Sequence, residues 1–288
     1  MELGFDEVMR IMEEIRNRTT VPAYSLVVVP DKEPGLFDSK FGGLPYWDMD
    51  KEYPKDADGN PLMLLAQLNF DRMEVEDALP DKGILQFYIR PDEMFGVDLD
   101  HPDVQDTFRV IYHETVDYDV SREAVENLHV PDSSQEEFTD CSPTQRELAI
   151  ECVGDTSFMG LCDYRFEQMF KDVAKELLDV DFGEGSIYEA IDDEVMDEIE
   201  EELEEEEAGS GHRMLGYPHF TQIDPREYNE EYRIYDTLLF QMDTDRASDE
   251  GRDYFVIWGD CGVGNFLINQ KDLEKRDFSK VLYNWDCC

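Results

Sequence analysis

Length, composition and charge limit what this chain can be. Its 288 residues are 41% hydrophobic and 12% aromatic, so it has enough apolar material for a large core and is not globally disordered. The 71 Asp and Glu residues outnumber the 25 Lys and Arg residues and give a formal net charge of −46. Such a surface repels nucleic acid and anionic membranes, so we expect neither as a partner, and it attracts basic proteins and cations.

The first half of the chain is predicted to be one helix followed by strands. Apolar residues at helical spacing predict a helix over 3–16. β-Branched and aromatic runs predict strands over 24–29, 62–70, 84–89 and 108–113, with a further strand over 147–152.

The middle of the chain changes to helical patterns. Apolar stripes predict helices over 163–178 and 187–203. The second stripe runs into the acidic segment 200–207, where like charges and the helix dipole both oppose the last turns. We expect this end to fray into a linker, which is either a solvated spacer or a docking tail.

The last third is predicted to be mostly strand again. Strands are expected over 236–242, 254–258, 264–268 and 281–285, with a short helix over 271–275. The glycine-rich stretch 259–264 is expected to connect two of these strands tightly.

Two segments of the chain resemble each other. Gly43-Leu44-Pro45 precedes a Leu-Leu-x-Gln run that ends at Gln67, and Gly216-Tyr217-Pro218 precedes one that ends at Gln241. Each Gln follows its Pro at nearly the same distance, 22 and 23 positions. This predicts an internally duplicated α+β domain, mostly antiparallel β with peripheral helices. Its expected parts are pseudo-repeat 1 at about 24–120, a helical insert at about 160–207 and pseudo-repeat 2 at about 212–288, within one domain over 1–288.

These motifs together resemble a known family. The chain is similar to the bacterial YwqG-like family, a domain of unknown function, over about 24–285. The residues that carry the resemblance are Phe41-Gly42-Gly43-Leu44-Pro45, Leu64-Leu65-Ala66-Gln67-Leu68, Leu79-Pro80, Gly83-Ile84-Leu85-Gln86-Phe87, Leu239-Phe240-Gln241-Met242-Asp243 and Trp258-Gly259-Asp260. The resemblance implies a mostly β fold with internal duplication, and no activity, cofactor or catalytic residue.

Polar residues at the two repeats form the first candidate site. Gln67 and Gln241 interrupt apolar strands, and a buried amide must be hydrogen-bonded. Each Gln either satisfies the backbone of the neighbouring Gly-x-Pro loop or belongs to a ligand site. The candidate ligand-binding residues of a cleft between the repeats are Gln67, Gln241, His212, His219, Trp47 and Trp258.

Acidic residues form the second candidate site. Asp243, Asp245 and Asp260 could bind a divalent cation such as calcium, which takes oxygen ligands, although the segment lacks the spacing of an EF-hand loop. A solvated hairpin loop is the alternative. We expect no other cofactor and assign no catalytic residue, because no nucleophile, phosphate-binding or dinucleotide-binding motif occurs.

The expected function is therefore binding. The first hypothesis is a non-catalytic protein whose acidic surface recognises a basic protein partner, for which an immunity-type or inhibitory role is one version. The alternative is a small-ligand-binding protein or an enzyme with a cleft between the repeats. The third hypothesis is a purely structural domain whose charge keeps it soluble. An organism-wide acidic bias is a separate explanation of the charge. The oligomeric state is left open.

The six cysteines and the termini indicate the compartment. The cysteines stand at 141, 152, 162, 261, 287 and 288 and include no Cys-x-x-Cys pair. No basic region precedes an apolar run at the N-terminus, and no apolar stretch is long enough to cross a bilayer. We therefore expect reduced thiols and a cytoplasmic location.

Overall fold

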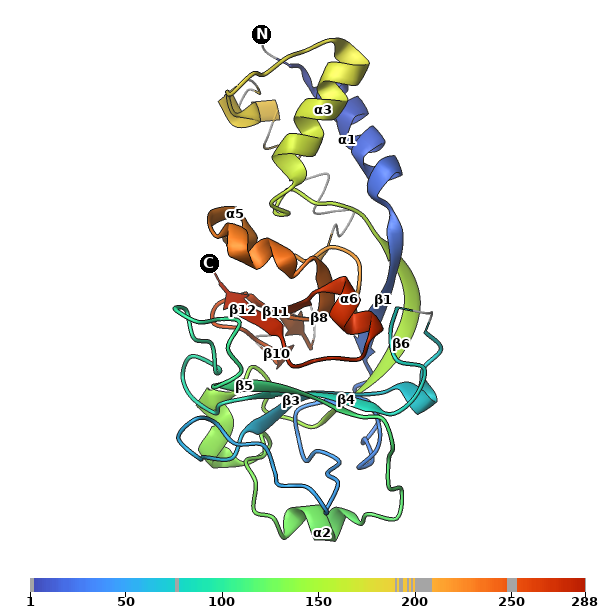
Figure 1. Cartoon of the computed structure of the whole chain (residues 1–288), viewed down its shortest axis with the longest axis vertical. Helices are drawn as coiled ribbons and strands as arrows, with labels where there is room; N and C mark the ends of the chain where they lie inside the picture. The colour runs from blue at the N-terminus through green and yellow to red at the C-terminus, as the bar shows by residue number, and fades with distance from the viewer. Residues whose placement is uncertain are drawn as a thin grey trace.

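The computed structural model describes residues 3–75, 78–189, 191, 194–195, 197, 199, 209–247 and 253–287. The fold is built on one antiparallel sheet of ten strands in the order β12-β11-β8-β7-β1-β6-β2-β3-β4-β5 (Figure 1). A separate two-stranded sheet consists of β9 and β10. The acidic run 200–207, in which we expected a fraying helix end, lies outside the described residues.

The strands fall into three groups along the sheet. The central pair is β1 (Val21–Val28) and β6 (Leu148–Ser157). On one side lie β2 (Lys40–Phe41), β3 (Met63–Asn69), β4 (Ile84–Ile89) and β5 (Phe108–His113). On the other side lie β7 (Arg213–Met214), β8 (Thr237–Asp243), β11 (Val263–Ile268) and β12 (Val281–Asp286), next to which the chain also forms β9 (Asp245–Arg246) and β10 (Tyr254–Val256).

The helices are few and peripheral. The α-helices are α1 (Phe5–Thr19), α2 (Arg122–Glu126), α3 (Phe166–Leu178), α5 (Pro225–Tyr228) and α6 (Gln270–Glu274). Short 3-10 helices cover Phe70–Arg72, Glu136–Cys141, Ile187–Glu189 and Glu230–Ile234. Among the described residues, none of these helices is long and apolar enough to cross a membrane.

The sheet folds over so that its two halves face each other across one core. The ring of Phe87 on β4 lies 4.5 Å from Phe240 on β8 and 4.9 Å from Phe266 on β11. Phe108 on β5 similarly meets Tyr283 on β12 at 5.3 Å. Ring pairs of this kind add about 0.5–1.5 kcal/mol beyond the burial of their area. The two halves are therefore joined by packing as well as by the strands β1 and β6.

A second core lies at the helical end of the molecule, at the top of Figure 1. The helices α1 and α3 pack together there, because each presents apolar residues at helical spacing. Their shared cluster includes Val8, Ile11, Ile15, Phe170 and Val173. This confirms the helix predicted over 163–178 and, shifted by a few residues, the one predicted over 3–16.

Gln67 fastens a loop to the outer face of the first half. The side chain is fully buried on β3, and its Oε1 accepts the Tyr46 N–H at 2.8 Å. Its Nε2 donates to the carbonyl oxygens of Leu36 and Asp38, both at 2.9 Å. On the adjacent strand, Gln86 donates to the Tyr46 carbonyl at 2.7 Å. The amide of Gln67 thus satisfies backbone groups that would otherwise be buried without partners.

Gln241 makes the matching bonds in the second half. Its Oε1 accepts the His219 N–H at 2.8 Å, and its Nε2 donates to the carbonyl oxygens of Gly209 and Gly211 at 2.7 and 2.8 Å. On the adjacent strand, Asn265 donates to the His219 carbonyl at 2.7 Å. Both glutamines therefore have the structural role that we weighed against ligand binding.

The backbone around the two Gly-x-Pro loops also matches. Gly42 and Gly43 have φ of 60° and 72°, and Leu215 and Gly216 have φ of 61° and 76°. A Cβ on Gly43 would lie 2.3 Å from Glu147, and one on Gly216 would lie 2.4 Å from Ser157, so both positions require glycine for space as well as conformation.

The strand pairing follows the same scheme in both halves. The ladder between β3 and β4 shifts register at Leu65, and the ladder between β8 and β11 shifts at Leu239, each two residues before the buried Gln. Read from its two ends, the sheet order places β3 and β8 at equivalent positions. These contacts relate the halves in space; a duplication of the chain as their origin stays a prediction.

The expected strands are present, most with small shifts at their ends, and the one expected over 147–152 extends to Ser157 as β6. The α+β, mostly antiparallel fold is confirmed. The strand expected over 254–258 ends at Val256 and pairs with β9, not with β11, because the chain turns at Trp258, whose carbonyl accepts the Gly262 N–H at 2.7 Å. The two-residue strands β2, β7 and β9 were not expected, since runs this short carry no periodicity.

Candidate ligand pocket beside His212

A polar cavity of about 660 Å³ lies between the central strand pair and the second half of the sheet. Its walls come from β1, the end of β6, the segment that leads into β7 and the segment that follows β8. The residues that line it are Ser25–Val28, Asp155–Phe158, Gly209–Arg213, Thr244, Asp245 and Phe255. This volume lies within the range of about 300–1,000 Å³ that is usual for small-molecule sites.

His212 is fixed in one orientation at this cavity. Its side chain is 5% exposed, and its Nδ1 accepts the backbone N–H of Asp243 at 3.0 Å. Its carbonyl accepts the N–H of Leu26, which ties the residue to β1. Because a backbone amide can only donate, Nδ1 must hold a lone pair, and the neutral ring carries its proton on Nε2.

The Nε2 atom of His212 is a buried donor without a hydrogen bond to any described residue. The nearest carboxylate oxygen, Oδ2 of Asp245, lies 3.5 Å away, which is within ion-pair range and too long for a good hydrogen bond. Leaving a buried donor unpaired costs about 1–3 kcal/mol, so the arrangement favours a ligand oxygen at this point.

This tautomer also limits the chemistry of His212. A general base or a metal ligand needs a lone pair on the nitrogen that faces the reaction site. Nε2 has none while Nδ1 accepts the Asp243 amide. A metal-binding histidine usually donates through its second nitrogen, which is the reverse of what is found here. In this tautomer, Nε2 of His212 can donate a hydrogen bond and cannot accept one.

Two carboxylates provide acceptors at the same cavity. Asp155 on β6 accepts the hydroxyl of Ser25 at 2.6 Å and the N–H of Thr156 at 2.7 Å. Asp245 accepts no hydrogen bond from the described residues and is 35% exposed. Each ionised carboxylate offers about four lone-pair positions, so both can accept hydroxyl or amino groups of a ligand.

Arg213 supports the wall of the cavity. Its side chain is buried, and it donates to Ser157 Oγ at 3.3 Å and to the carbonyl of Ser210. Ser157 Oγ also accepts the N–H of Tyr217 at 3.0 Å. These bonds hold the segment that carries His212 against β6, so we assign Arg213 a structural role.

The remaining predicted ligand residues lie apart from this cavity. Trp47 packs in an apolar cluster with Tyr53 and His113, and Trp258 packs in the main core beside Phe95. Gln67 faces the loop of the first half. Gln241 lies next to the cavity, because its Nε2 donates to the carbonyl oxygens of Gly209 and Gly211, which line it.

His219 lies beside a cysteine. Its Nδ1 is 3.7 Å from the sulfur of Cys162. Burial raises the pKa of the Cys162 thiol, and the carboxylates of Asp163 and Asp224 act in the same direction. A catalytic cysteine needs a lowered pKa, so this thiol stays protonated and the pair does not form an activated nucleophile.

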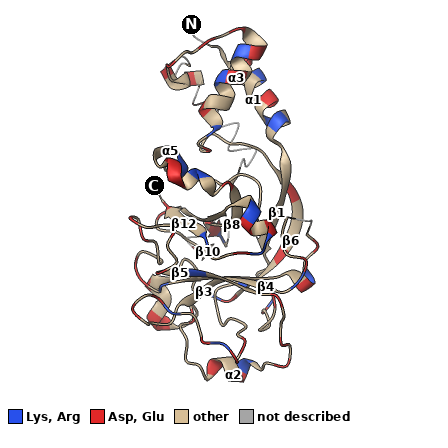
Figure 2. Cartoon of the chain, viewed as in Figure 1, with Lys and Arg blue, Asp and Glu red and all other residues tan. Residues whose placement is uncertain are grey.

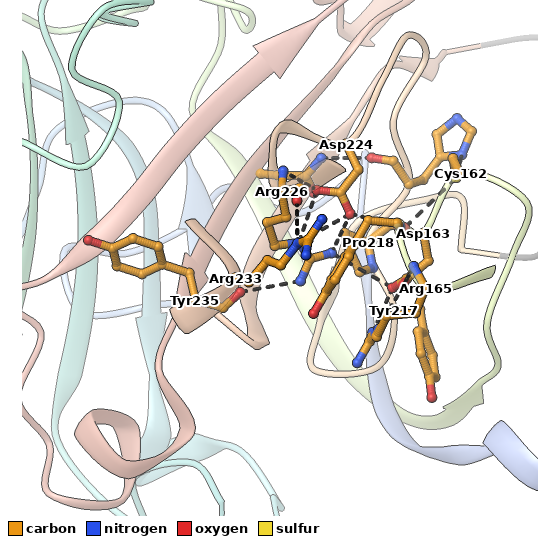
Figure 3. Close-up of polar contacts among 12 residues, drawn as sticks. Cys162, Asp163, Arg165, Tyr217, Pro218, Asp224, Arg226, Arg233 and Tyr235 are labelled. Carbon is orange, nitrogen blue, oxygen red and sulfur yellow. Dashed lines mark hydrogen bonds and ion pairs between the residues drawn. The ribbon is translucent and has the colours of Figure 1, made fainter. Parts of the chain in front are cut away.

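Next to this pair lies a buried network of ion pairs, drawn in Figure 3. The guanidinium of Arg226 is 1% exposed and lies 2.7 Å from Asp224 and 3.7 Å from Asp163, both of which are fully buried. Arg165 binds Asp163 at 2.6 Å, which balances the charges. The ring of Tyr164 lies 4.8 Å from Arg226. Because each buried charge has a partner, the network ties 163–165 to the segment around α5.

The three proposed cation ligands, Asp243, Asp245 and Asp260, have different surroundings. The two carboxylate oxygens of Asp243 accept the N–H groups of Gly211 and Thr244, both at 2.7 Å, and Asp260 lies exposed in the turn after Trp258. Among the described residues, no group of three His, Cys, Asp or Glu side chains is arranged to hold a metal ion. Calcium binding at Asp243, Asp245 and Asp260 stays a prediction.

Sequence reasoning singled out His212 and, as a possible cation ligand, its neighbour Asp245, but not Ser25 and Asp155. Ser25 and Asp155 stand far from His212 in the chain and carry no motif. They meet it because β1 pairs with both β6 and β7. The sequence did contain one signal. His212 stands four positions before Gly216, and Ser39 stands four positions before Gly43, so the two repeats carry different residues at an equivalent position.

The family of the chain follows from comparison with known proteins. Residues 39–287 match a family model described as a domain of unknown function, DUF1963. The match covers most of the 288 residues, so the chain belongs to this family. No curated protein matches the chain.

Proposed function

We propose that this protein binds a small polyhydroxylated molecule of the sugar or polyol type in the cavity beside His212, without transforming it. The observation that carries the proposal is the buried Nε2–H of His212, a residue that lines the cavity, which has no hydrogen bond to the described residues. A ligand hydroxyl can accept this proton while it donates its own to a carboxylate.

The two carboxylates select the kind of ligand. Asp155 and Asp245 accept hydrogen bonds and cannot donate them while ionised. A hydroxyl that donates to an ionised carboxylate forms a short, strong bond. A ligand with several hydroxyls therefore matches one donor and two acceptors, whereas an anionic ligand would be repelled by them and by the net charge of −46.

The donor state of His212 supports binding over catalysis. Nε2 cannot remove a proton from a substrate while Nδ1 accepts the Asp243 amide. The hydroxyl of Ser157 accepts two hydrogen bonds, from Arg213 and Tyr217, and is held as a structural group. The thiol of Cys162 is kept protonated by burial.

The test is a binding survey with a matched variant. Saturation-transfer NMR is measured on wild-type protein with the neutral monosaccharides glucose, galactose, mannose and ribose. The variant is His212→Ser, because Ser39 fills the equivalent position in the first half and accepts the N–H of Asn69 at 2.9 Å. Ser can thus replace Nδ1 as acceptor and lacks the Nε2 donor. We expect at least one sugar to bind wild type and not the variant, and the absence of saturation transfer from wild type to any of the sugars would refute the proposal.

A second candidate function is recognition of a basic protein, for which an immunity-type or inhibitory role is one version. The chain has 71 Asp and Glu residues against 25 Lys and Arg residues, which favours this function. Many of the basic side chains also form ion pairs within the protein, among them Lys40, Arg122, Arg165 and Arg226. Capture of basic proteins that weakens steeply with salt would support recognition of a basic protein.

Within its family, the narrower relationship to YwqG-like proteins is likewise a proposal that rests on the shared motifs.

A further inference from the structure

The strand β6 has an edge that the sheet does not cover. It runs from Leu148 to Ser157, and β2 pairs with it only at Leu148 and Ala149. One further bond joins the Ile150 N–H to the Ser39 carbonyl at 3.2 Å. Beyond this point the described residues provide a paired strand on one side of β6 only, which is β1.

Successive residues of a strand direct their backbone N–H and C=O groups to opposite edges, and this shows which groups of β6 are free. Ile150 directs its N–H toward the β2 side, so Cys152, Gly154 and Thr156 direct their backbone groups there as well. The N–H of Thr156 is taken by the carboxylate of Asp155 at 2.7 Å. The N–H groups of Cys152 and Gly154 form no hydrogen bond with the described residues.

An open groove of about 1,020 Å³ lies along this edge. Its lining comes from β1, from β6 and from the segment that follows β3, and includes Met73, Val75 and Val153. The side chain of Val153 is 51% exposed, and a Cβ added to Gly154 would have no atom within 4 Å. The edge is therefore accessible from outside.

The groove lies between β6 and the chain that continues β3. Lys40 of β2 lies opposite Ala149 of β6 on one side and Gln67 of β3 on the other, so β2 separates these two strands. The chain that continues β3 includes Met73 and Val75, and it lines the far wall of the groove. The groove thus extends the line of β2, where neighbouring strands are spaced about 4.8 Å apart.

The charge of the groove indicates what can fill it. Glu74, Asp81 and Asp155 line it, and none of its described lining residues is Lys or Arg. Figure 2 shows acidic positions along β6 at this part of the molecule. Apolar side chains at Met73, Val75 and Val153 alternate with these carboxylates around the groove.

We propose that an extended basic segment of a partner protein adds to β6 as an extra strand in this groove. The segment runs antiparallel to β6 and continues β2, with main-chain bonds to Cys152 and Gly154. Val153 and Asp155 stand two residues apart and share one face of β6. The Lys or Arg residues of the segment therefore lie on that face, beside Asp155, and its apolar residues lie on the opposite face. The inference rests on the second candidate function, because it states where and how a basic partner binds.

A proline substitution tests the edge selectively. The N–H of Gly154 faces away from β1, so Gly154→Pro removes a free donor and leaves the pairing of β1 with β6 in place. Gly154→Ala is the matched control, because it keeps the N–H and its Cβ meets no atom. The probe is a fluorescent peptide of alternating Lys and Val, seven residues long, and a Glu–Val peptide is the charge control.

The expected result is salt-sensitive binding of the Lys–Val peptide to wild type and to Gly154→Ala, at least tenfold weaker for Gly154→Pro. Hydrogen exchange at the amides of Cys152 and Gly154 should slow when the peptide binds. Equal binding by all three proteins would overturn the edge site and leave the basic-partner function standing. No salt-sensitive binding by wild type would overturn both. A wild-type dimer that Gly154→Pro dissociates would show that a second copy of the chain occupies the edge, which also overturns the proposal.

Discussion

His212 occupies the position that Ser39 holds in the other half of the sheet. Ser39 Oγ accepts the N–H of Asn69 at 2.9 Å, and His212 Nδ1 accepts the N–H of Asp243 at 3.0 Å. Asn69 and Asp243 each stand two residues after a buried Gln. The structural bond is thus the same in both halves, and the histidine adds a second polar atom, Nε2, which is buried without a hydrogen bond to the described residues. The difference between the halves marks the candidate site.

This relationship predicts how substitutions of His212 affect stability. His212→Ser keeps an acceptor for the Asp243 amide, whereas His212→Ala leaves that amide without one. We expect the Ala variant to be less stable than the Ser variant by about 1–2 kcal/mol. Urea denaturation of both variants measures the difference. Equal midpoints would show that Ser does not replace Nδ1 at this position.

Gln241 should be far less tolerant of substitution than the exposed Gln222. Gln241→Leu leaves the His219 amide and the carbonyls of Gly209 and Gly211 without their partner. We expect a loss of about 3 kcal/mol or more, since each stranded buried group costs about 1–3 kcal/mol. Gln222→Leu breaks one exposed bond, to the Cys287 carbonyl, and should cost about 0.5 kcal/mol or less. Similar denaturation midpoints for the two variants would contradict the role assigned to Gln241.

The buried ion network should be sensitive to the removal of one charge. Arg226→Met leaves Asp224 with no cationic partner among the residues that the structure describes, and removing one partner of a buried pair costs about 3–5 kcal/mol. Arg246→Met is the control, because that side chain is exposed. Thermal unfolding of both variants provides the comparison. A melting temperature of Arg226→Met equal to that of the control would mean that the network adds nothing to stability.

His113 should make the fold sensitive to mild acid. Burial lowers the pKa of this histidine to about 4 from an ordinary value of 6.5. Its Nε2 pairs with Gln86 at 2.9 Å, and its Nδ1 has no described partner, so a second proton would have no acceptor. The unfolded chain takes up a proton below pH 6.5 and the folded chain only near pH 4, so stability falls as the pH drops through this window.

The measurement is the pH dependence of unfolding for wild type and His113→Gln. The folded-state shift corresponds to about 3 kcal/mol between the two ends of the window, which wild type should lose relative to the variant. Above pH 7 the difference between the two proteins should be constant. Parallel curves from pH 7 to pH 4 would show that His113 does not remain neutral in the folded protein.

Local patterns predicted the elements of this fold better than their arrangement. The strands around Gln67 and Gln241 were predictable because apolar and β-branched runs mark buried strands, and an amide within them must be bonded. The pairing of β1 with both β6 and β7 was not, because β7 has two residues and contacts between distant segments leave no periodic signal.

The candidate site was only partly predictable for the same reason. His212 was singled out because it stands near the second Gly-x-Pro loop. The protonation of its Nε2 depends on the backbone N–H of Asp243, the last residue of β8. Asp155 joins the cavity through strand pairing alone. The equivalence of Ser39 and His212 can be read from the sequence. That both residues accept a backbone N–H could be known only from the structure.

The most direct test of the central claim is ¹⁵N NMR of the His212 ring during titration with the four monosaccharides. The free protein should show a protonated Nε2 and an unprotonated Nδ1, because Nδ1 accepts the Asp243 amide. A sugar that binds should shift the Nε2 signal in a saturable way and leave the Nδ1 signal in place. A proton on Nδ1 in the free protein, or ring signals that no sugar changes, would contradict the assignment of His212 as the donor that binds the ligand.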